Sequence, residues 1–152
     1  MAMTMSGEVQ LEASREEVWV KLNDPEVLKV CIPGCEELAK TDDGGFRAVA
    51  KMKVGPVSAR FRGKVMLSDL DPPNGCKISG EGEGGVAGFA KGGATVKLCE
   101  RDGGALLSYD VEAQIGGKLA QLGQRLVSGV AKKLADEFFA NFANVVRSEP
   151  ST

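Results

Sequence analysis

The sequence predicts an α+β domain in which a curved antiparallel sheet of seven strands wraps around one long C-terminal helix. Between residues 4 and 115, short segments of alternating apolar and polar residues are separated by tight-turn sequences, which is typical of strands. After Gly116-Gly117 the apolar period changes from two to about 3.6, which indicates a helix. The length of 152 residues suits one domain.

The first segment predicts one strand followed by two short helices. Thr4–Leu11 alternates as a strand does. Ser14 precedes an acidic first turn and caps a helix that runs through Leu22. Asp24-Pro25 begins a second helix, because Asp caps helices and Pro is tolerated at the first helical position. That helix ends near Ile32-Pro33-Gly34, a turn signal.

Six further strands follow in series. Tight turns such as Gly55-Pro56 and Asp102-Gly103-Gly104 connect them, so neighbouring strands run antiparallel. The predicted strands are Glu36–Thr41, Phe46–Val54, Val57–Leu70, Cys76–Gly84, Ala90–Glu100 and Ala105–Ile115.

The last element is a single predicted helix from Lys118 to Val146. Its apolar residues form one stripe that would face the sheet: Leu119, Leu122, Leu126, Val130, Leu134, Phe138, Phe142 and Val145. We expect one domain over residues 1–147 and a polar tail over residues 148–152.

Composition and charge argue against several classes of protein. The net charge is -2 and no half of the chain is extreme, which disfavours nucleic-acid binding. No apolar run approaches the ~20 residues that span a bilayer, and Met1 to Ser6 does not resemble a secretory signal. These features predict a cytoplasmic location, with peripheral contact at the inner face of the cell membrane left open.

The four cysteines are predicted to be free thiols and not metal ligands. Cys31 and Cys35 have a spacing that could form half of a zinc site, but Cys76 and Cys99 lie singly in strand-like segments. Reduced cysteines in a cytoplasmic protein act as small hydrophobic residues.

Several segments resemble the CoxG family, named for a component of carbon monoxide dehydrogenase, within the helix-grip (SRPBCC, START-like) superfamily. The resemblance covers almost the whole chain and is most specific from Leu22 to Glu36. The matching segments are Met5–Glu8, Arg15–Trp19, Leu22–Leu28, Cys31–Glu36, Val54–Val57 and Gly80–Gly82. The resemblance implies a protein that recruits a molybdenum hydroxylase to the membrane and handles its quinone electron acceptor. Many relatives carry a further C-terminal linker and membrane-binding tail.

The inner face of the predicted sheet is apolar but unusually small. In Val57–Leu67, alternate residues separate an apolar face from one bearing Arg60, Arg62 and Lys64, and the apolar face must point inward. Gly and Ala hold nearly half of the inner positions, whereas a packed core needs large side chains. Either the long helix packs very close to the sheet, or a cavity holds a ligand; we favour the cavity.

The predicted cavity would suit a lipophilic ligand, because each buried methylene contributes about 0.8 kcal/mol. The resemblance implies a quinone, menaquinone or ubiquinone. The candidate ligand-binding residues are Phe46, Ala50, Met52, Phe61, Val65, Ile78, Gly82, Phe89, Ala94, Val96, Leu98, Tyr109, Val111, Leu119, Leu122, Leu126 and Val130.

Two aromatic candidates have alternative interpretations. Tyr109 is the only inner-face residue that offers a hydroxyl to a quinone carbonyl, although an ordinary core tyrosine is slightly favoured. Phe89 lies in the glycine-rich stretch Gly84–Gly93 and is either exposed or a cap on the pocket mouth. This stretch is a plausible gate for ligand entry.

Nucleotide binding and catalysis are not expected. The segment Gly80–Gly85 matches GxGxxG, but a strand follows it where the dinucleotide fingerprint requires a helix. The chain contains no histidine, and its paired carboxylates fall at helix starts and turns. We therefore predict a non-catalytic protein without catalytic residues. A pocket enzyme of the cyclase or hydrolase type, and a ligand-free adaptor for the dehydrogenase, remain the alternatives.

The outer face carries six basic residues on two neighbouring strands. They are Arg47, Lys51, Lys53, Arg60, Arg62 and Lys64. A turn at Gly55-Pro56 would bring them together into a basic patch. Charge runs are usually solvated faces, and Glu81 and Glu83 on the next strand would partly neutralise this one. The alternative is contact with an acidic partner or with anionic lipid headgroups.

Overall fold

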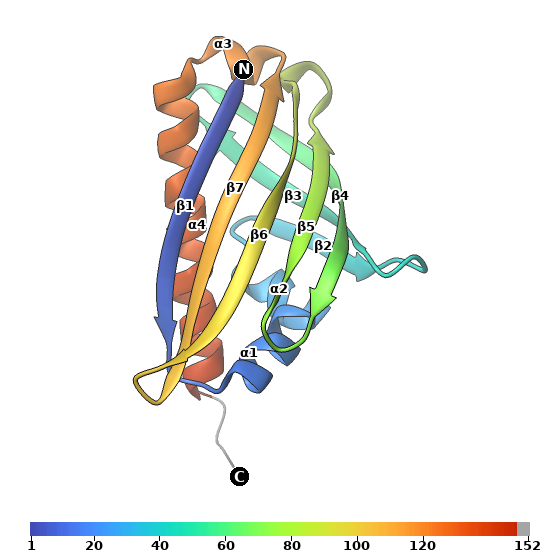
Figure 1. Ribbon diagram of the computed structural model, residues 1–152. Helices are drawn as coiled ribbons and strands as arrows, with labels where there is room; N and C mark the ends of the chain where they lie inside the picture. The colour runs from blue at the N-terminus through green and yellow to red at the C-terminus, as the bar shows by residue number, and fades with distance from the viewer. Residues whose placement is uncertain (149–152) are drawn as a thin grey trace.

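A computed structural model describes residues 1–148 and confirms the predicted architecture (Figure 1). Seven antiparallel strands form one curved sheet in the order β1-β7-β6-β5-β4-β3-β2. The sheet curves around the long helix α4 (Gln124–Ser148). The strands are β1 (Ala2–Leu11), β2 (Cys35–Lys40), β3 (Phe46–Val54), β4 (Val57–Asp71), β5 (Gly75–Glu83), β6 (Phe89–Arg101) and β7 (Gly104–Gly116).

The register of the strands follows from the predicted turns. Val54 pairs with Val57 across Gly55, whose φ of 58° suits a glycine. The first strand pairs with the last, so that Gly7 lies opposite Tyr109. Between β5 and β6 the chain forms a short 3₁₀ helix, η1 (Gly85–Ala87), within the glycine-rich stretch that the sequence suggested as a gate.

Two short helices, α1 (Arg15–Leu22) and α2 (Pro25–Cys31), cover one end of the sheet. The Ser14 hydroxyl accepts a hydrogen bond from the backbone N–H of Glu17 at 3.2 Å. The Asp24 carboxylate accepts one from the backbone N–H of Glu26 at 3.0 Å. Both caps satisfy backbone donors that the helix itself leaves unpaired, as the sequence predicted.

The prediction of one unbroken C-terminal helix is wrong. A short helix, α3 (Lys118–Gln121), ends at Leu122, and α4 begins after Gly123. Gly123 has a φ of 93°, which interrupts a right-handed helix. In the first turn of α4 after this break, Val127 is buried and Leu126 is 38% exposed.

The hydrophobic core is divided into two clusters near opposite ends of the sheet. The lower cluster in Figure 1 surrounds Phe142, which is fully buried with Leu11, Val18 and Leu107. The upper cluster contains Met3, Val54, Ile115, Leu119 and Val127. Between the clusters, the inner-face residues of β4 and β5 are only partly buried, whereas Phe46 and Ala50 of β3 are buried. The middle of the sheet is therefore not filled by side chains of α4.

The predicted polar tail begins at Ser148, the last residue of α4, and its remaining residues 149–152 lie outside the described part of the chain. Within residues 1–148, no helix combines the length and the apolar character that crossing a bilayer requires.

Candidate functional site

An apolar cavity of about 280 Å³ lies between the inner face of the sheet and α3. Most of its wall comes from β3 and β4, and Leu119 of α3 contributes from the opposite side. The lining residues are Ile32, Ala48, Ala50, Met52, Val54, Phe61, Gly63, Gly82, Ala90 and Leu119. None of these described residues carries an ionisable group or a side-chain hydroxyl. The cavity can therefore accept an apolar guest but offers no acid or base.

A second hollow of about 300 Å³ continues the cavity along the inner face of β5, β6 and β7. It shares Gly82 and Ala90 with the first. Its other inner-face residues are Val65, Ile78, Gly80, Gly92, Ala94, Val111 and Ala113. Glu81, Lys91, Gly93 and Glu112 also border it, but strand alternation places them on the outer face. Together the two hollows form an apolar trough, which we call the inner trough. Its size suits an elongated ligand better than a compact one.

Small residues along the inner trough have two different causes. A Cβ built on Gly82 would make only ordinary contacts, the nearest at 3.6 Å to the Arg62 carbonyl oxygen. Gly82 therefore leaves space that a larger side chain could fill. A Cβ on Gly92 would instead clash with the backbone carbonyl of Glu112. Gly92 is required by close approach of the strands, and only part of the glycine content reflects the cavity.

The structure brings together about half of the predicted ligand-binding residues. Those that line the inner trough are Ala50, Met52, Phe61, Val65, Ile78, Gly82, Ala94, Val111 and Leu119. Leu98 and Val96 belong to the lower core, and Leu122 and Val130 pack against the upper core. Phe46 is buried and Leu126 is exposed. These positions face inward along the strands as predicted, but the cores at the two ends of the sheet occupy several of them.

Tyr109 is placed as a core tyrosine. Its ring stacks on Phe139 with centroids 5.1 Å apart. Its hydroxyl lies over Gly7, where a Cβ would approach within 2.5 Å. Tyr109 is absent from the lining of both hollows. The hydroxyl is therefore directed toward β1, and the interpretation that the sequence slightly favoured agrees with this geometry.

Phe89 lies on the outer face of the sheet and not in the inner trough. Its neighbour Ala90 faces the cavity, so alternation directs Phe89 outward. The ring covers Gly116 on β7, where no Cβ could be placed, and 45% of the residue is exposed. The predicted role as a cap on the pocket mouth is therefore not supported by its position.

Ile32 is a cavity residue that sequence reasoning missed. It forms the C-terminal cap of α2, and its backbone N–H donates to the Leu28 carbonyl at 2.9 Å. Asn141 Nδ2 of α4 donates to the Cys31 carbonyl at 3.0 Å, which fixes the end of α2 against the long helix. The available signal was a branched apolar residue directly before Pro33-Gly34, inside the segment most specific for the family resemblance.

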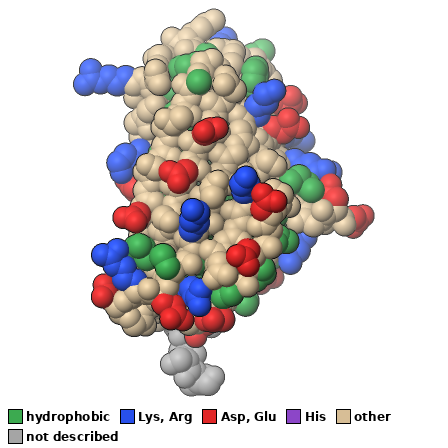
Figure 2. Space-filling view, in the orientation of Figure 1, with side chains coloured by type: hydrophobic (Ala, Val, Ile, Leu, Met, Phe, Trp, Pro, Cys, Tyr) green, Lys and Arg blue, Asp and Glu red, His purple; other side chains and the backbone are tan. Residues whose placement is uncertain are grey.

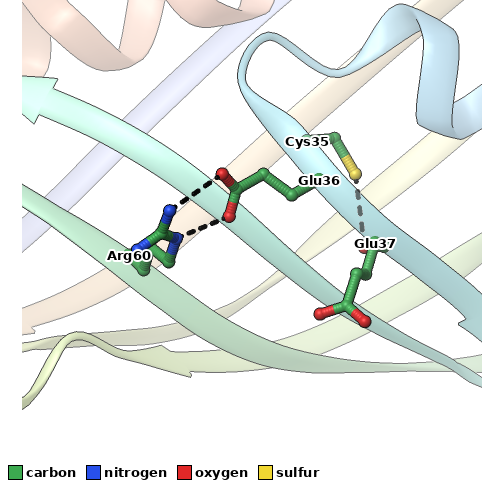
Figure 3. Close-up of polar contacts among 4 residues, drawn as sticks. All are labelled: Cys35, Glu36, Glu37 and Arg60. Carbon is green, nitrogen blue, oxygen red and sulfur yellow. Dashed lines mark hydrogen bonds and ion pairs between the residues drawn. The ribbon is translucent and has the colours of Figure 1, made fainter.

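The six basic residues on the outer face do cluster as predicted. Arg47 lies opposite Lys64, and Lys51 opposite Arg60, across β3 and β4. Acidic residues of β2 and of the β2–β3 turn neutralise part of the patch. Glu36 of β2 accepts from Arg60 Nε at 2.7 Å, reaching across β3 (Figure 3).

The second ion pair of this face joins Lys64 Nζ to the Asp43 carboxylate at 2.8 Å. The hydrogen bond from Lys64 is the main cause that lowers the pKa of Asp43 to about 2, with a further contribution from the Thr41 hydroxyl. The hydrogen bond from Arg60 likewise lowers the pKa of Glu36. Within residues 1–148, Arg47, Lys51, Lys53 and Arg62 form no ion pair, so the patch retains positive charge.

The cysteines are free thiols in the structure. Burial raises the pKa of Cys31 and of Cys76, which keeps both thiols protonated near neutral pH. Burial is also the main cause that raises the pKa of Cys35, whose Sγ donates to the Glu37 carbonyl (Figure 3). No group of three Cys, Asp or Glu residues in the described chain is arranged to hold a metal ion.

Solved structures share this architecture. A conserved protein from Geobacillus kaustophilus is similar, with 30% identity, a TM-score of 0.88 and 95% of each chain covered. An uncharacterised protein from Rhizobium leguminosarum has 14% identity and a TM-score of 0.74, over 98% of this chain and 97% of that one. Ara h 8.0201 has 14% identity and a TM-score of 0.69, over 98% of this chain and all (100%) of the other. The last two likenesses concern the fold alone.

A comparison with curated proteins finds no significant relative. The family comparison is specific: the model of CoxG, described as a subunit of carbon monoxide dehydrogenase, matches residues 7–147. That match includes every strand except the first residues of β1, and all of the inner trough. With its curved seven-stranded sheet and long C-terminal helix, the chain belongs to the CoxG family.

Proposed function

We propose that this protein holds a lipophilic ligand, a quinone or another isoprenoid lipid, in the inner trough without transforming it. One observation carries the proposal. The cavity between the sheet and α3 is lined by aliphatic residues together with Met52 and Phe61. It lies where the core is interrupted. Apolar surface that faces water costs free energy, which burial beneath an apolar guest would recover.

The shape and chemistry of the inner trough fit an isoprenoid chain. Its inward-facing side chains are apolar and most of them are small, so they make contact along a chain but select no polar group. Ten buried methylenes would contribute about 8 kcal/mol before the cost of association. In this proposal the quinone ring occupies the cavity at Phe61 and Leu119, and the prenyl tail follows the shallower hollow beside Ile78.

The partner in this proposal is a carbon monoxide dehydrogenase-type molybdenum hydroxylase. The family description names a subunit of carbon monoxide dehydrogenase. The protein would supply the bound quinone to the dehydrogenase as its electron acceptor, or it would assist recruitment of the dehydrogenase to the membrane. The basic patch is a candidate docking surface, because four of its six residues keep their charge outside the ion pairs described above: Arg47, Lys51, Lys53 and Arg62.

A non-catalytic role is favoured over a pocket enzyme. General acid–base or nucleophilic catalysis needs an ionisable group within hydrogen-bonding reach of the substrate. The described lining of the cavity offers none. A catalytic function would require two converging ionisable groups in the inner trough. A ligand-free adaptor would require that the inner trough binds no ligand.

The proposal is tested by adding a short-chain menaquinone or ubiquinone to the purified protein and recording native mass spectra. We expect one bound quinone per chain. Ala48→Phe should abolish binding, because Ala48 lines the cavity on β3 and a phenyl ring there would occupy it. Val49→Phe is the matched control, since the next residue on the strand faces outward.

The opposite results would be decisive. Binding that survives Ala48→Phe would place the ligand elsewhere. A wild-type protein that binds neither quinone nor lipid, yet captures the dehydrogenase, would be an adaptor.

A further inference from the structure

We propose that the aromatic stack of Tyr109 on Phe139 sets how much of a ligand's tail the inner trough can bury. We call this pair of rings the aromatic stop. The inference deepens the proposed function, because it specifies which lipophilic ligands the inner trough favours, and it rests on that function for the identity of the ligand. The selection is by tail length, since the inner trough offers no polar group that could select otherwise.

The inner trough ends at one row of residues on β6 and β7. Ala94 and Val111 lie opposite each other and are the last inward positions of these strands that line the shallower hollow. The next inward positions are Val96 and Tyr109, which also pair with each other and pack against the lower core. Tyr109 therefore stands where the open space of the trough meets the packed core.

Alternation along β7 places Tyr109 on the inner face. Asp110 and Glu112 are exposed, while Val111 between them lines the inner trough. Figure 2 shows acidic and basic side chains spread over the outer face of the strands in view. Tyr109 and Val111 are two residues apart and so share the opposite, inner face.

Aromatic contacts hold the stop in place. The Tyr109 ring stacks on Phe139 of α4 with centroids 5.1 Å apart and planes 18° apart. Phe139 meets Phe138 edge to face at 5.0 Å, and Phe138 stacks on the buried Phe142. On the β1 side the ring lies over Gly7, where a Cβ would be 2.7 Å from the Tyr109 Cζ. The stop thus bridges the sheet and α4, and it is supported by the lower core.

Small residues keep the path from the cavity to the stop open. Gly82 and Ala90 lie opposite each other on β5 and β6 and line both hollows. A Cβ on Gly82 would make only ordinary contacts, so its absence leaves usable space. Ile78 is the last inward position of β5 in the trough. From Gly82 to Ile78 the strand rises about 13 Å, which is about the length of two or three extended prenyl units.

This geometry predicts how affinity depends on tail length. Each prenyl unit between Gly82 and the stop removes apolar surface from water, so it should raise the affinity at least tenfold. A unit beyond the stop would stay in water, because the packed lower core leaves no space for it. The affinity should therefore rise from menadione, which has no tail, to about menaquinone-3, and then stay level.

The test is competition among menadione, menaquinone-2, menaquinone-3 and menaquinone-4 for the full chain, recorded by native mass spectrometry. For the wild type we expect menaquinone-2 to bind at least tenfold more tightly than menadione, and menaquinone-3 and menaquinone-4 to bind within about twofold of each other. Tyr109→Leu shortens the stop, so menaquinone-4 should then bind about fivefold more tightly than menaquinone-3. A purely structural role of Tyr109 would lower all affinities together and leave this ratio unchanged.

Tyr109→Phe is the matched control for that variant, because it keeps the ring and removes only the hydroxyl. It should show the wild-type ratios. A changed ratio in Tyr109→Phe would show that the hydroxyl takes part, and it would overturn a stop that acts by its shape.

Ala94→Leu tests the same space from the other direction. Ala94 lines the shallower hollow but not the cavity. A larger side chain there should leave menadione binding unchanged and weaken menaquinone-3 binding at least tenfold. Thr95→Leu is the matched control, since the next residue on the strand faces outward, and it should leave the whole series unchanged. Equal effects of the two substitutions would contradict a tail in this hollow.

Straight-chain alcohols from octanol to octadecanol, measured in parallel, separate this inference from the proposed function. If quinones bind but Tyr109→Leu keeps menaquinone-3 and menaquinone-4 level, the stop is refuted and quinone binding stands. If no quinone binds, yet the alcohols show a length limit that Tyr109→Leu extends, the stop stands and the quinone is refuted. A wild type that binds neither series overturns both.

Discussion

The backbones of Gly88 and Gly117 lie in direct contact, so that neither position can carry a side chain. A Cβ on Gly117 would lie 2.5 Å from the Cα of Gly88, and a Cβ on Gly88 would clash with the Gly116 carbonyl. Both residues have positive φ, 116° at Gly88 and 74° at Gly117. This contact joins the end of η1 to the start of α3, whose Leu119 lines the cavity.

Gly117→Ala should therefore destabilise the domain and loosen the cover of the cavity. The left-handed backbone and the clash with Gly88 together should cost about 2–4 kcal/mol of unfolding free energy. Gly103→Ala is the matched control, since Gly103 has a φ of 79° but nothing within 4 Å of its Cβ position. It should cost only about 1 kcal/mol. Urea unfolding of both variants measures the difference, and equal losses would show that the contact is unimportant.

Most of the fold could be predicted from the sequence, because its signals are local. Alternation, turn glycines and helix caps are each encoded within a few residues, and the register between Val54 and Val57 followed from one turn. The broken helix could not be predicted in this way. Gly123 falls inside a convincing 3.6-residue period, and that period does not reveal the positive φ that interrupts the helix there.

The candidate site could be predicted only in part. Strand alternation correctly identified inward-facing residues such as Met52 and Ile78. It could not show which inward positions belong to the two core clusters, because that depends on where α4 contacts the sheet. Leu98 was predicted to bind the ligand but lies in the lower cluster. Ile32 was missed since it enters the cavity from a turn, where no periodicity indicates direction.

Gly129→Ala should stabilise the protein. Gly129 lies within α4, is exposed, and has open space around its Cβ position. Alanine loses less conformational entropy than glycine on helix formation, so we expect a gain of about 0.5–1 kcal/mol in unfolding free energy. Thermal and urea unfolding measure it. A loss of stability would mean that α4 is bent or contacted at this point.

Acid should weaken the turn at Asp43 in a defined pH window. The pKa of Asp43 is lowered to about 2 by Lys64 and Thr41, below the ordinary value of 3.8. The ionised carboxylate therefore stabilises the folded state above about pH 4, and this contribution is lost as the pH falls through 2. The difference in unfolding free energy between the wild type and Asp43→Asn should shrink over that window. A difference that stays constant from about pH 5 to pH 2 would contradict the ion pair.

Two phenylalanines distinguish the packed core from the inner trough. Phe142 is fully buried in the lower core, where it stacks on Phe138 with centroids 5.9 Å apart. Phe142→Ala should cost about 3–5 kcal/mol of unfolding free energy. Phe61 is only partly buried and lines the cavity, so Phe61→Ala should cost less than about 2 kcal/mol. Urea unfolding of the two variants measures both losses, and a larger loss for Phe61→Ala would contradict this division of the core.

Added ligand should raise the unfolding free energy of the two phenylalanine variants by different amounts. A ligand at a hundredfold excess over its dissociation constant stabilises the folded state by about 2.7 kcal/mol. Phe61→Ala should reduce this increment, because the ring forms a wall of the cavity and lies over Gly84, where a Cβ would be 2.7 Å away. Phe142→Ala should retain it. If menaquinone stabilises Phe61→Ala as much as the wild type, the ligand does not contact this wall, and the cavity beside α3 is not its binding site.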